Sequence, residues 1–192
     1  TVANSLTRDK GSLTITKTLS DGGSGFSGSF TVSVTCTGDG GSYGPLAIAY
    51  PTPGSTTIND IPTGNTCTVT EGALPTNPTG YSWGTPVIGA GVNITVAGPN
   101  AVTVANSLTR DKGSLTITKT VTGAASDFTG SFTMSVVCTG DGGTYNPIIA
   151  YPTPGSFTVS NIPTSSCAVT ETGRSDPPAG YFWGTMTVTG SP

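Results

Sequence analysis

The sequence TVANSLTRDKGSLTITKT occupies residues 1–18 and recurs letter for letter at residues 103–120. An identical run of this length does not arise by chance, so the chain is a tandem repeat. Within the run, TVAN is typical of a strand that closes one repeat, SLTRDKG of a polar connector, and SLTITKT of a strand that opens the next. The repeat boundaries therefore fall near Gly11 and Gly113.

This reading divides the chain into three parts. We expect residues 1–10 to hold the closing strand of a preceding repeat with its linker. Residues 11–108 then form one complete repeat, and residues 109–192 form a second repeat that lacks a closing strand of its own. The sequence is what an excerpt from a longer array of repeats would contain.

Composition excludes several classes of function. The chain has 28 Gly, 15 Pro and only 9% charged residues, with a net charge of −3, so no basic surface for nucleic acid is expected. It contains no histidine and no recognisable pair of nucleophile and base, which argues against a multiple-turnover enzyme and gives no reason to expect a metal or cofactor. No apolar run approaches the roughly 20 residues that span a bilayer.

Apolar residues alternate with polar ones in short stretches that turn signals separate, and no helical periodicity is present. In the first repeat Leu13 and Ile15 share a face, Phe30, Val32 and Val34 share another, and the second repeat follows the same pattern up to a last expected strand at residues 185–189. About seven short strands per repeat indicate an all-β fold of tandem immunoglobulin-like β sandwiches.

The four cysteines fall two per repeat. Cys67 follows Cys36 by 31 residues, and Cys167 follows Cys138 by 29. A pair that persists through a small change in spacing indicates one disulfide in each repeat, and hence an oxidising, extracellular location. The alternative is a zinc site, for which two cysteines without histidine supply too few ligands.

A few polar side chains fall on the apolar faces of the expected strands. Lys17 continues the face of Leu13 and Ile15, Glu71 shares a face with Cys67 and Val69, and Asn106 shares one with Val102 and Val104. Lys119 and Glu171 occupy the matching positions of the second repeat, and the chain has no other glutamate. Because an isolated buried charge costs many kcal/mol, these groups must be paired, neutralised or chemically consumed.

These residues resemble those of CnaB-type domains of Gram-positive pilins and surface adhesins, as do the LTITK strand, the CTVTE strand and the closing VTVAN strand. The Cys-x-Val-x-Glu strand, the GYxW element and the cysteine pair also resemble tandem repeat domains of actinobacterial surface proteins. The CnaB resemblance implies an Ig-like module in which a first-strand Lys bonds covalently to a last-strand Asn with help from a buried acid. A disulfide is a departure from that pattern.

Carried onto this sequence, the resemblance implies an isopeptide bond between Lys17 and Asn106, with Glu71 as acid and base. A buried Lys and Glu ion pair with a hydrogen-bonded Asn is the alternative, and it stays open at this point. In the second repeat Lys119, with Glu171 in the catalytic role, has no Asn downstream. The spare Asn4 of another copy is the candidate partner if chains polymerise by donor-strand addition.

Two functions from different classes follow. The first is a structural repeat of an extracellular bacterial surface stalk, pilus or filament, whose partners are copies of itself or neighbouring repeats head to tail. The second is an adhesin module that binds a host or glycan ligand through its loops. Exposed tyrosines gathered on one edge would favour the adhesin, and the candidates beside loops are Tyr43, Tyr50, Tyr145 and Tyr151.

Overall fold

The computed structural model describes residues 1–22, 24–123 and 127–190, which form β-strands and no helix. These residues therefore offer no helical segment that could cross a membrane. The chain divides into two compact units, unit 1 at Thr1–Thr109 and unit 2 at Arg110–Pro192. The prediction of an all-β fold of tandem Ig-like sandwiches is confirmed.

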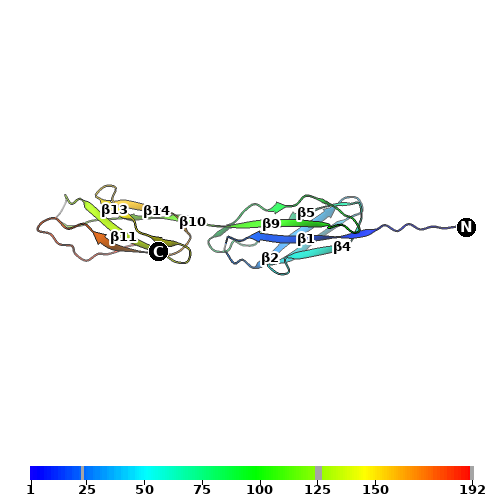
Figure 1. The fold of residues 1–192 in the computed structure, drawn as a ribbon, viewed down its shortest axis with the longest axis horizontal. Coiled ribbons are helices and arrows are strands. Elements are labelled where there is room, and N and C mark those ends of the chain that lie inside the picture. The colour runs from blue at the N-terminus through cyan, green and yellow to red at the C-terminus, as the bar shows by residue number, and fades with distance from the viewer. Residues whose placement is uncertain (23, 124–126, 191–192) are drawn as a thin grey trace. The chain divides into compact units, whose positions relative to one another are not determined.

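Unit 1 is a sandwich of two sheets (Figure 1). One sheet has the order β4-β1-β9-β6, with β7 also paired to β9, and the other has the order β3-β2-β5-β8. The strands are β1 Lys10–Ser20, β2 Gly28–Cys36, β3 Ser42–Tyr50, β4 Ser55–Pro62, β5 Thr66–Glu71, β6 Tyr81–Trp83, β7 Val87–Ile88, β8 Val92–Asn93 and β9 Ala101–Arg110.

Unit 2 repeats most of this arrangement. The strands are β10 Lys112–Thr118, β11 Gly130–Cys138, β12 Gly143–Tyr145, β13 Ile148–Tyr151, β14 Ser156–Pro163 and β15 Cys167–Arg174. β12, β13 and β15 all pair with β11, whereas β10 pairs with β14. The strand expected at residues 185–189 is not formed, and that prediction is wrong. In unit 1 the matching strand β7 pairs with β9, and the described residues of unit 2 include no strand in the place of β9.

The inner faces of the two sheets of unit 1 build one continuous core. Leu13 and Ile15 of β1 are fully buried against Val32 and Val34 of β2, and Val102 and Val104 of β9 complete the cluster. Each such side chain contributes about 1.5–3 kcal/mol on burial. In unit 2 the core is split into two clusters, and Leu115 and Ile117 of β10 are only partly buried.

The first and last strands of unit 1 lie side by side and run parallel (Figure 1). The pairing extends from Thr14 opposite Ala101 to Ser20 opposite Ser107. β9 then continues through Arg110, and Leu108 is buried in unit 1. The prediction that SLTRDKG is a polar connector is therefore wrong for its first half, which belongs to β9. Leu108 continues the alternation of Val102, Val104 and Asn106, so it extends the buried face of the strand.

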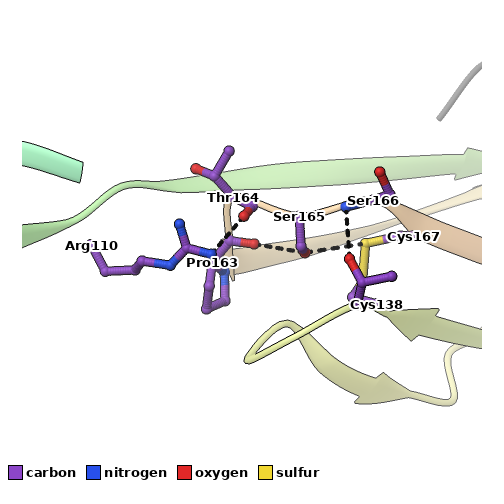
Figure 2. Close-up of a disulfide and its surroundings, with 8 residues drawn as sticks. Arg110, Cys138, Pro163, Thr164, Ser165, Ser166 and Cys167 are labelled. Carbon is purple, nitrogen blue, oxygen red and sulfur yellow. Dashed lines mark hydrogen bonds between the residues drawn. A yellow bond between two sulfur atoms is a disulfide. The ribbon is translucent and has the colours of Figure 1, made fainter. Parts of the chain in front are cut away.

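The remaining part of the connector is held by what we call the arginine latch. In unit 2 the Arg110 guanidinium donates to both oxygens of Asp141, at 3.1 and 2.9 Å. It also donates to the carbonyl of Thr164 at 2.7 Å (Figure 2). In unit 1 Arg8 makes the matching contacts to Asp39 and to the carbonyl of Thr63. The connector is thus bonded to the unit that follows it.

The latch predicts a pH dependence for unit 2. The hydrogen bond from Arg110 lowers the pKa of Asp141 below the ordinary value of 3.8. A carboxylate whose pKa is lowered on folding stabilises the fold above its unfolded pKa, and that stabilisation is lost as the pH falls through the folded pKa. We expect Asp141→Asn to lower the urea midpoint of unit 2 at neutral pH, and the difference from wild type to shrink as the pH falls below 3.8 and to vanish once the pH is below the folded pKa of Asp141.

The matched control is Asp176→Asn, which removes an exposed carboxylate elsewhere in the same unit. This variant should follow the wild-type urea midpoint throughout the pH range. A difference for Asp141→Asn that persists unchanged in strong acid would contradict an electrostatic latch.

Candidate functional site

Lys17 points from β1 into the sandwich of unit 1, and its side chain is completely buried. The alternation of β1 places it there, because it lies two residues beyond Ile15 on the same face. Its ammonium lies 4.2 Å from the centroid of the Phe30 ring and donates to Glu71 Oε1 at 2.7 Å. Lys17 thus gains a cation–π contact and a charge-assisted hydrogen bond in place of water.

Glu71 and Asn106 complete the cluster from two other strands. Glu71 is the last residue of β5, and its side chain is 2% exposed. Asn106 lies on β9, where the parallel register sets it opposite Leu19, two residues beyond Lys17. Asn106 Nδ2 donates to Glu71 Oε1 at 3.1 Å, so Lys17 and Asn106 share one carboxylate oxygen. We call these three residues the unit 1 triad.

Burial sets the electrostatics of the triad. Desolvation lowers the pKa of Lys17, and the hydrogen bond and charge of Glu71 oppose that shift only in part. Two acceptors of the triad, Glu71 Oε2 and Asn106 Oδ1, are buried without a hydrogen-bond partner among the described residues. An unpaired buried acceptor costs about 1–3 kcal/mol, so the cluster is incompletely satisfied as an ionised pair.

An aromatic cluster covers the triad, and our sequence reasoning did not assign it that role. Phe30 packs against Phe26, Trp83 and Tyr50, with ring centroids 5.1–6.3 Å apart within this cluster. Trp83 Nε1 donates to the carbonyl of Pro75 at 2.7 Å, which satisfies its polar atom. The available signal was the position of Phe30, which heads the alternating face of the second strand.

The matching residues of unit 2 form a more open pair. Lys119 donates to Glu171 Oε2 at 2.8 Å and lies 4.3 Å from the centroid of Phe132. Its side chain is 18% exposed, against 0% for Lys17. Arg174 also approaches the Glu171 carboxylate, at 3.6 Å. Asn4 lies in the exposed, strand-free segment before β1, and it is a member of neither cluster.

Each unit has one disulfide. Cys36 is bonded to Cys67 and Cys138 to Cys167, so none of these four cysteines is free. Both bonds join directly paired residues of neighbouring strands in one sheet, β2 with β5 and β11 with β15. Figure 2 shows the Cys138–Cys167 bond close to the arginine latch. Among the described residues, no group of three potential ligands could hold a metal ion.

The tyrosines that would have favoured an adhesin do not form an exposed cluster. All four are half-buried. Tyr43 and Tyr145 pack against the cores, whereas Tyr50 and Tyr151 contact Phe30 and Phe132. Their main contacts are therefore structural.

Comparison with known protein families shows to which family both units belong. The model of a family described as a domain of unknown function, DUF5979, matches residues 13–109 and again residues 115–192. The chain belongs to the DUF5979 family. The two matches show that this DUF5979 protein carries the domain twice in tandem. A search of curated protein sequences found no match.

Solved structures similar to the chain are Gram-positive surface proteins. Two B repeat units of the collagen-binding protein of Staphylococcus aureus superpose with a TM-score of 0.55 and 15% identity, over 84% of this chain and 44% of that one. The major pilin of Streptococcus pyogenes gives 0.33 and 16%, over 86% and 83%. The chain thus spans less than half the length of the first structure. That first likeness shows the fold, which is CnaB-type and Ig-like, as the sequence predicted.

Removing the carboxylate should test how much the burial of the triad matters. Glu71→Ala leaves a fully buried ammonium without its acceptor, which costs about 3–5 kcal/mol. The matched variant Glu171→Ala should cost less, because Lys119 keeps partial access to water. Urea unfolding with hydrogen exchange read separately for each unit measures both losses. Equal losses of unfolding free energy in the two units would show that the difference in burial between Lys17 and Lys119 does not affect stability.

Proposed function

We propose that this DUF5979 protein is a structural repeat of an extracellular bacterial surface stalk, pilus or filament, joined head to tail to neighbouring repeats or copies of itself. The observation that carries this proposal is the unit 1 triad, which brings Lys17 of the first strand and Asn106 of the last strand to one carboxylate oxygen. Repeats of a collagen-binding surface protein share the fold. Two disulfides suit an oxidising, extracellular location.

The strand arrangement of unit 1 supports a role under tension. β1 and β9 are parallel, so their outward connections leave at opposite ends of the same strand pair. A pull applied through the two ends therefore shears seven paired residues together, from Thr14 to Ser20, and does not peel them apart one by one. Cooperative loading of this kind is what a stalk module requires.

We further propose that the triad is a self-crosslinking site. The neutral amine of Lys17 attacks the side-chain carbonyl carbon of Asn106. An amide bond forms between Lys17 Nζ and that carbon, the bond from the carbon to Nδ2 breaks, and ammonia leaves. Glu71 carries the proton from the amine to the leaving group. The reaction occurs once per unit and needs no co-reactant.

The electrostatics of the site favour this chemistry over a permanent ion pair. The lowered pKa of Lys17 increases the fraction of free amine at a given pH. Glu71 Oε2 has no hydrogen-bond partner among the described residues, so it is available to accept the proton that Lys17 gives up. Proton transfer from Lys17 to Glu71 thus yields both the nucleophile and the acid.

The tyrosines do not support the adhesin alternative. Their packing against the cores removes the observation that would have favoured a binding surface. The structural role is therefore the one that we propose.

The intact mass of the chain after reduction and denaturation tests the crosslink. We expect the monomeric fraction to weigh one ammonia less than its sequence requires, because unit 1 has formed the Lys17 to Asn106 bond. Lys17→Ala and Glu71→Ala should each have the full mass of their sequences, since they remove the nucleophile or the proton carrier.

Lys10→Ala is the matched control, because Lys10 lies on the same strand with an exposed side chain. It should keep the loss of ammonia, and peptide mapping should place the linkage between Lys17 and Asn106. A wild-type chain of full sequence mass would reduce the triad to a buried ion pair.

Single-molecule pulling tests the mechanical consequence. In the wild type, the chain between Lys17 and Asn106 should not extend, because the crosslink carries the force past it. In Lys17→Ala this segment should extend, except for the 31-residue span closed by Cys36 and Cys67, which should extend only after reduction. Extension of the whole segment in the oxidised wild type would show that neither bond bears the load.

A further inference from the structure

The disulfide of unit 1 and the carboxylate of its triad belong to the same pair of strands. Cys36 is the last residue of β2 and lies directly opposite Cys67 of β5. Two pairs further along the same inward face, Val32 of β2 lies opposite Glu71. The disulfide therefore fastens the strand that carries Glu71, four residues before that carboxylate.

The same two strands supply both groups that contact the Lys17 ammonium. Glu71 accepts its hydrogen bond from the end of β5, and the ring of Phe30 on β2 has its centroid 4.2 Å from Lys17 Nζ. The ammonium comes from β1, in the other sheet. The position of β5 on β2 thus decides whether the carboxylate and the ring meet the ammonium together.

The Glu71 end of β5 depends on β2 for its position. The other neighbour of β5 in the sheet is β8, which pairs only with Thr66 and Cys67 at the opposite end. Beyond Glu71, Gly72 donates its backbone N–H to a carbonyl of β2 at 2.8 Å, and residues 73–80 form no strand. Among the described residues, the backbone of β5 near Glu71 is therefore paired with β2 alone.

The outward side chains of this strand pair do not distinguish one register from another. All of them are serine or threonine, and they are Ser29, Thr31, Ser33 and Thr35 of β2 and Thr66, Thr68 and Thr70 of β5. A shift of the pairing by two residues keeps every side chain on its own face, so it exchanges one pair of hydroxyls for another. The same shift moves Glu71 by about 7 Å along β2. The 2.7 Å hydrogen bond to Lys17 is lost in that register.

The disulfide removes this ambiguity on the inward face. Val69 lies opposite Val34, and a shift that sets it opposite Val32 exchanges one valine pair for another. The cysteines, in contrast, do not tolerate the shift. Their Cα atoms are 3.9 Å apart in the native register, and a slip of two residues carries them beyond the roughly 7 Å that a disulfide can span.

Unit 2 repeats this relation although the chain between its cysteines has a different length. Cys138 of β11 pairs with Cys167 of β15, and Glu171 again follows the second cysteine by four residues and pairs with β11. The two cysteines are 29 residues apart in unit 2 and 31 in unit 1. The separation of the cysteines therefore differs between the units, whereas the offset from cysteine to glutamate does not.

We propose that the Cys36–Cys67 disulfide is a redox gate for the crosslinking site of unit 1, because it holds Glu71 in the register in which that site reacts. This inference rests on the proposed function. In the gating step the two thiols lose two electrons and two protons to an external disulfide oxidant, which becomes two thiols. The amide bond between Lys17 and Asn106 then forms without any further oxidant.

The gate ties crosslinking to the compartment that the chain has reached. Thiols stay reduced in the cytosol, whereas disulfides form in the oxidising space outside it. A chain whose first and last strands are joined covalently cannot pass a narrow pore as a single extended thread. Delay of the crosslink until oxidation therefore keeps the chain threadable until it has left the cytosol.

Refolding of the full chain with and without oxidant tests the gate. Cys36 and Cys67 are 7% and 0% exposed, so the redox state has to be set before unit 1 folds. The chain is synthesised in a reducing cell-free system, isolated in urea, and diluted into native buffer that holds either glutathione disulfide or a phosphine reductant. Tryptophan fluorescence follows folding, and intact mass after an acid quench follows the loss of ammonia. A chain that has already lost ammonia when it is isolated would overturn the gate.

We expect the oxidised chain to lose one ammonia at least roughly tenfold faster than the reduced chain, counted from the time at which each has folded. A second cycle, in which the reduced chain is unfolded and then refolded in glutathione disulfide, should restore the fast rate. Cys36→Ala with Cys67→Ala should react slowly in both buffers. Cys138→Ala with Cys167→Ala removes the other disulfide and should keep the fast rate in oxidant.

Ile61→Val separates positioning from stability. Ile61 is fully buried opposite Gly11 of β1, so its truncation lowers the urea midpoint of unit 1 without changing a residue of β2 or β5. This variant should lose ammonia at the wild-type rate in oxidant. A fall in its rate as large as that of the Cys36 and Cys67 variant would show that the disulfide acts through stability, and would overturn the gate.

The rates also separate the gate from the proposed crosslink. Equal rates of ammonia loss in the oxidised and the reduced chain would overturn the gate and leave the crosslink standing. A full sequence mass in both samples would remove the crosslink, and the gate with it.

Discussion

The ammonium of Lys17 lies in a place from which water is excluded, and much of unit 1 follows from that constraint. A buried cation needs an acceptor within hydrogen-bond reach, which Glu71 provides from the end of β5. Glu71 in turn receives Asn106 from β9, so one carboxylate connects three strands of two sheets. The ring of Phe30 packs against the ammonium, and the burial of the Lys17 side chain lowers its pKa through desolvation.

The two covalent elements of unit 1 act on different parts of the chain. The disulfide joins two neighbouring strands in the middle of the sequence, and closing a loop of this length contributes about 3.5 kcal/mol by the chain-entropy model. It does not connect the strands through which a pull enters and leaves. The proposed Lys17 to Asn106 bond does connect them, so the disulfide and the crosslink have separate functions, one in stability and one in tension.

Strand alternation in the sequence predicted much of the site because it is a local property. Lys17, Glu71 and Asn106 each share a face with two apolar neighbours, and that was enough to direct all three inward. The parallel pairing of β1 with β9 is a property of the whole fold, so strand patterns alone do not contain it. The arginine latch escaped prediction for the same reason, since Arg110 and Asp141 come together only when the turn before β12 folds back. The prediction of a strand at residues 185–189 was wrong because a strand forms there only when a neighbouring strand is present to pair with it. The local sequence does not contain that information.

The arginine latch and the length of β9 affect the resistance of the chain to proteolysis. Four of the seven Lys and Arg residues of the chain lie in the connector part of the two copies of the repeated motif, so the joint between repeats is rich in cleavage sites for a trypsin-like enzyme. A protease must draw several residues of extended, unbonded backbone into its active site. At this joint β9 runs to Arg110, the Arg110 guanidinium is engaged, and β10 starts at Lys112. Digestion at the joint therefore has to wait for local unfolding.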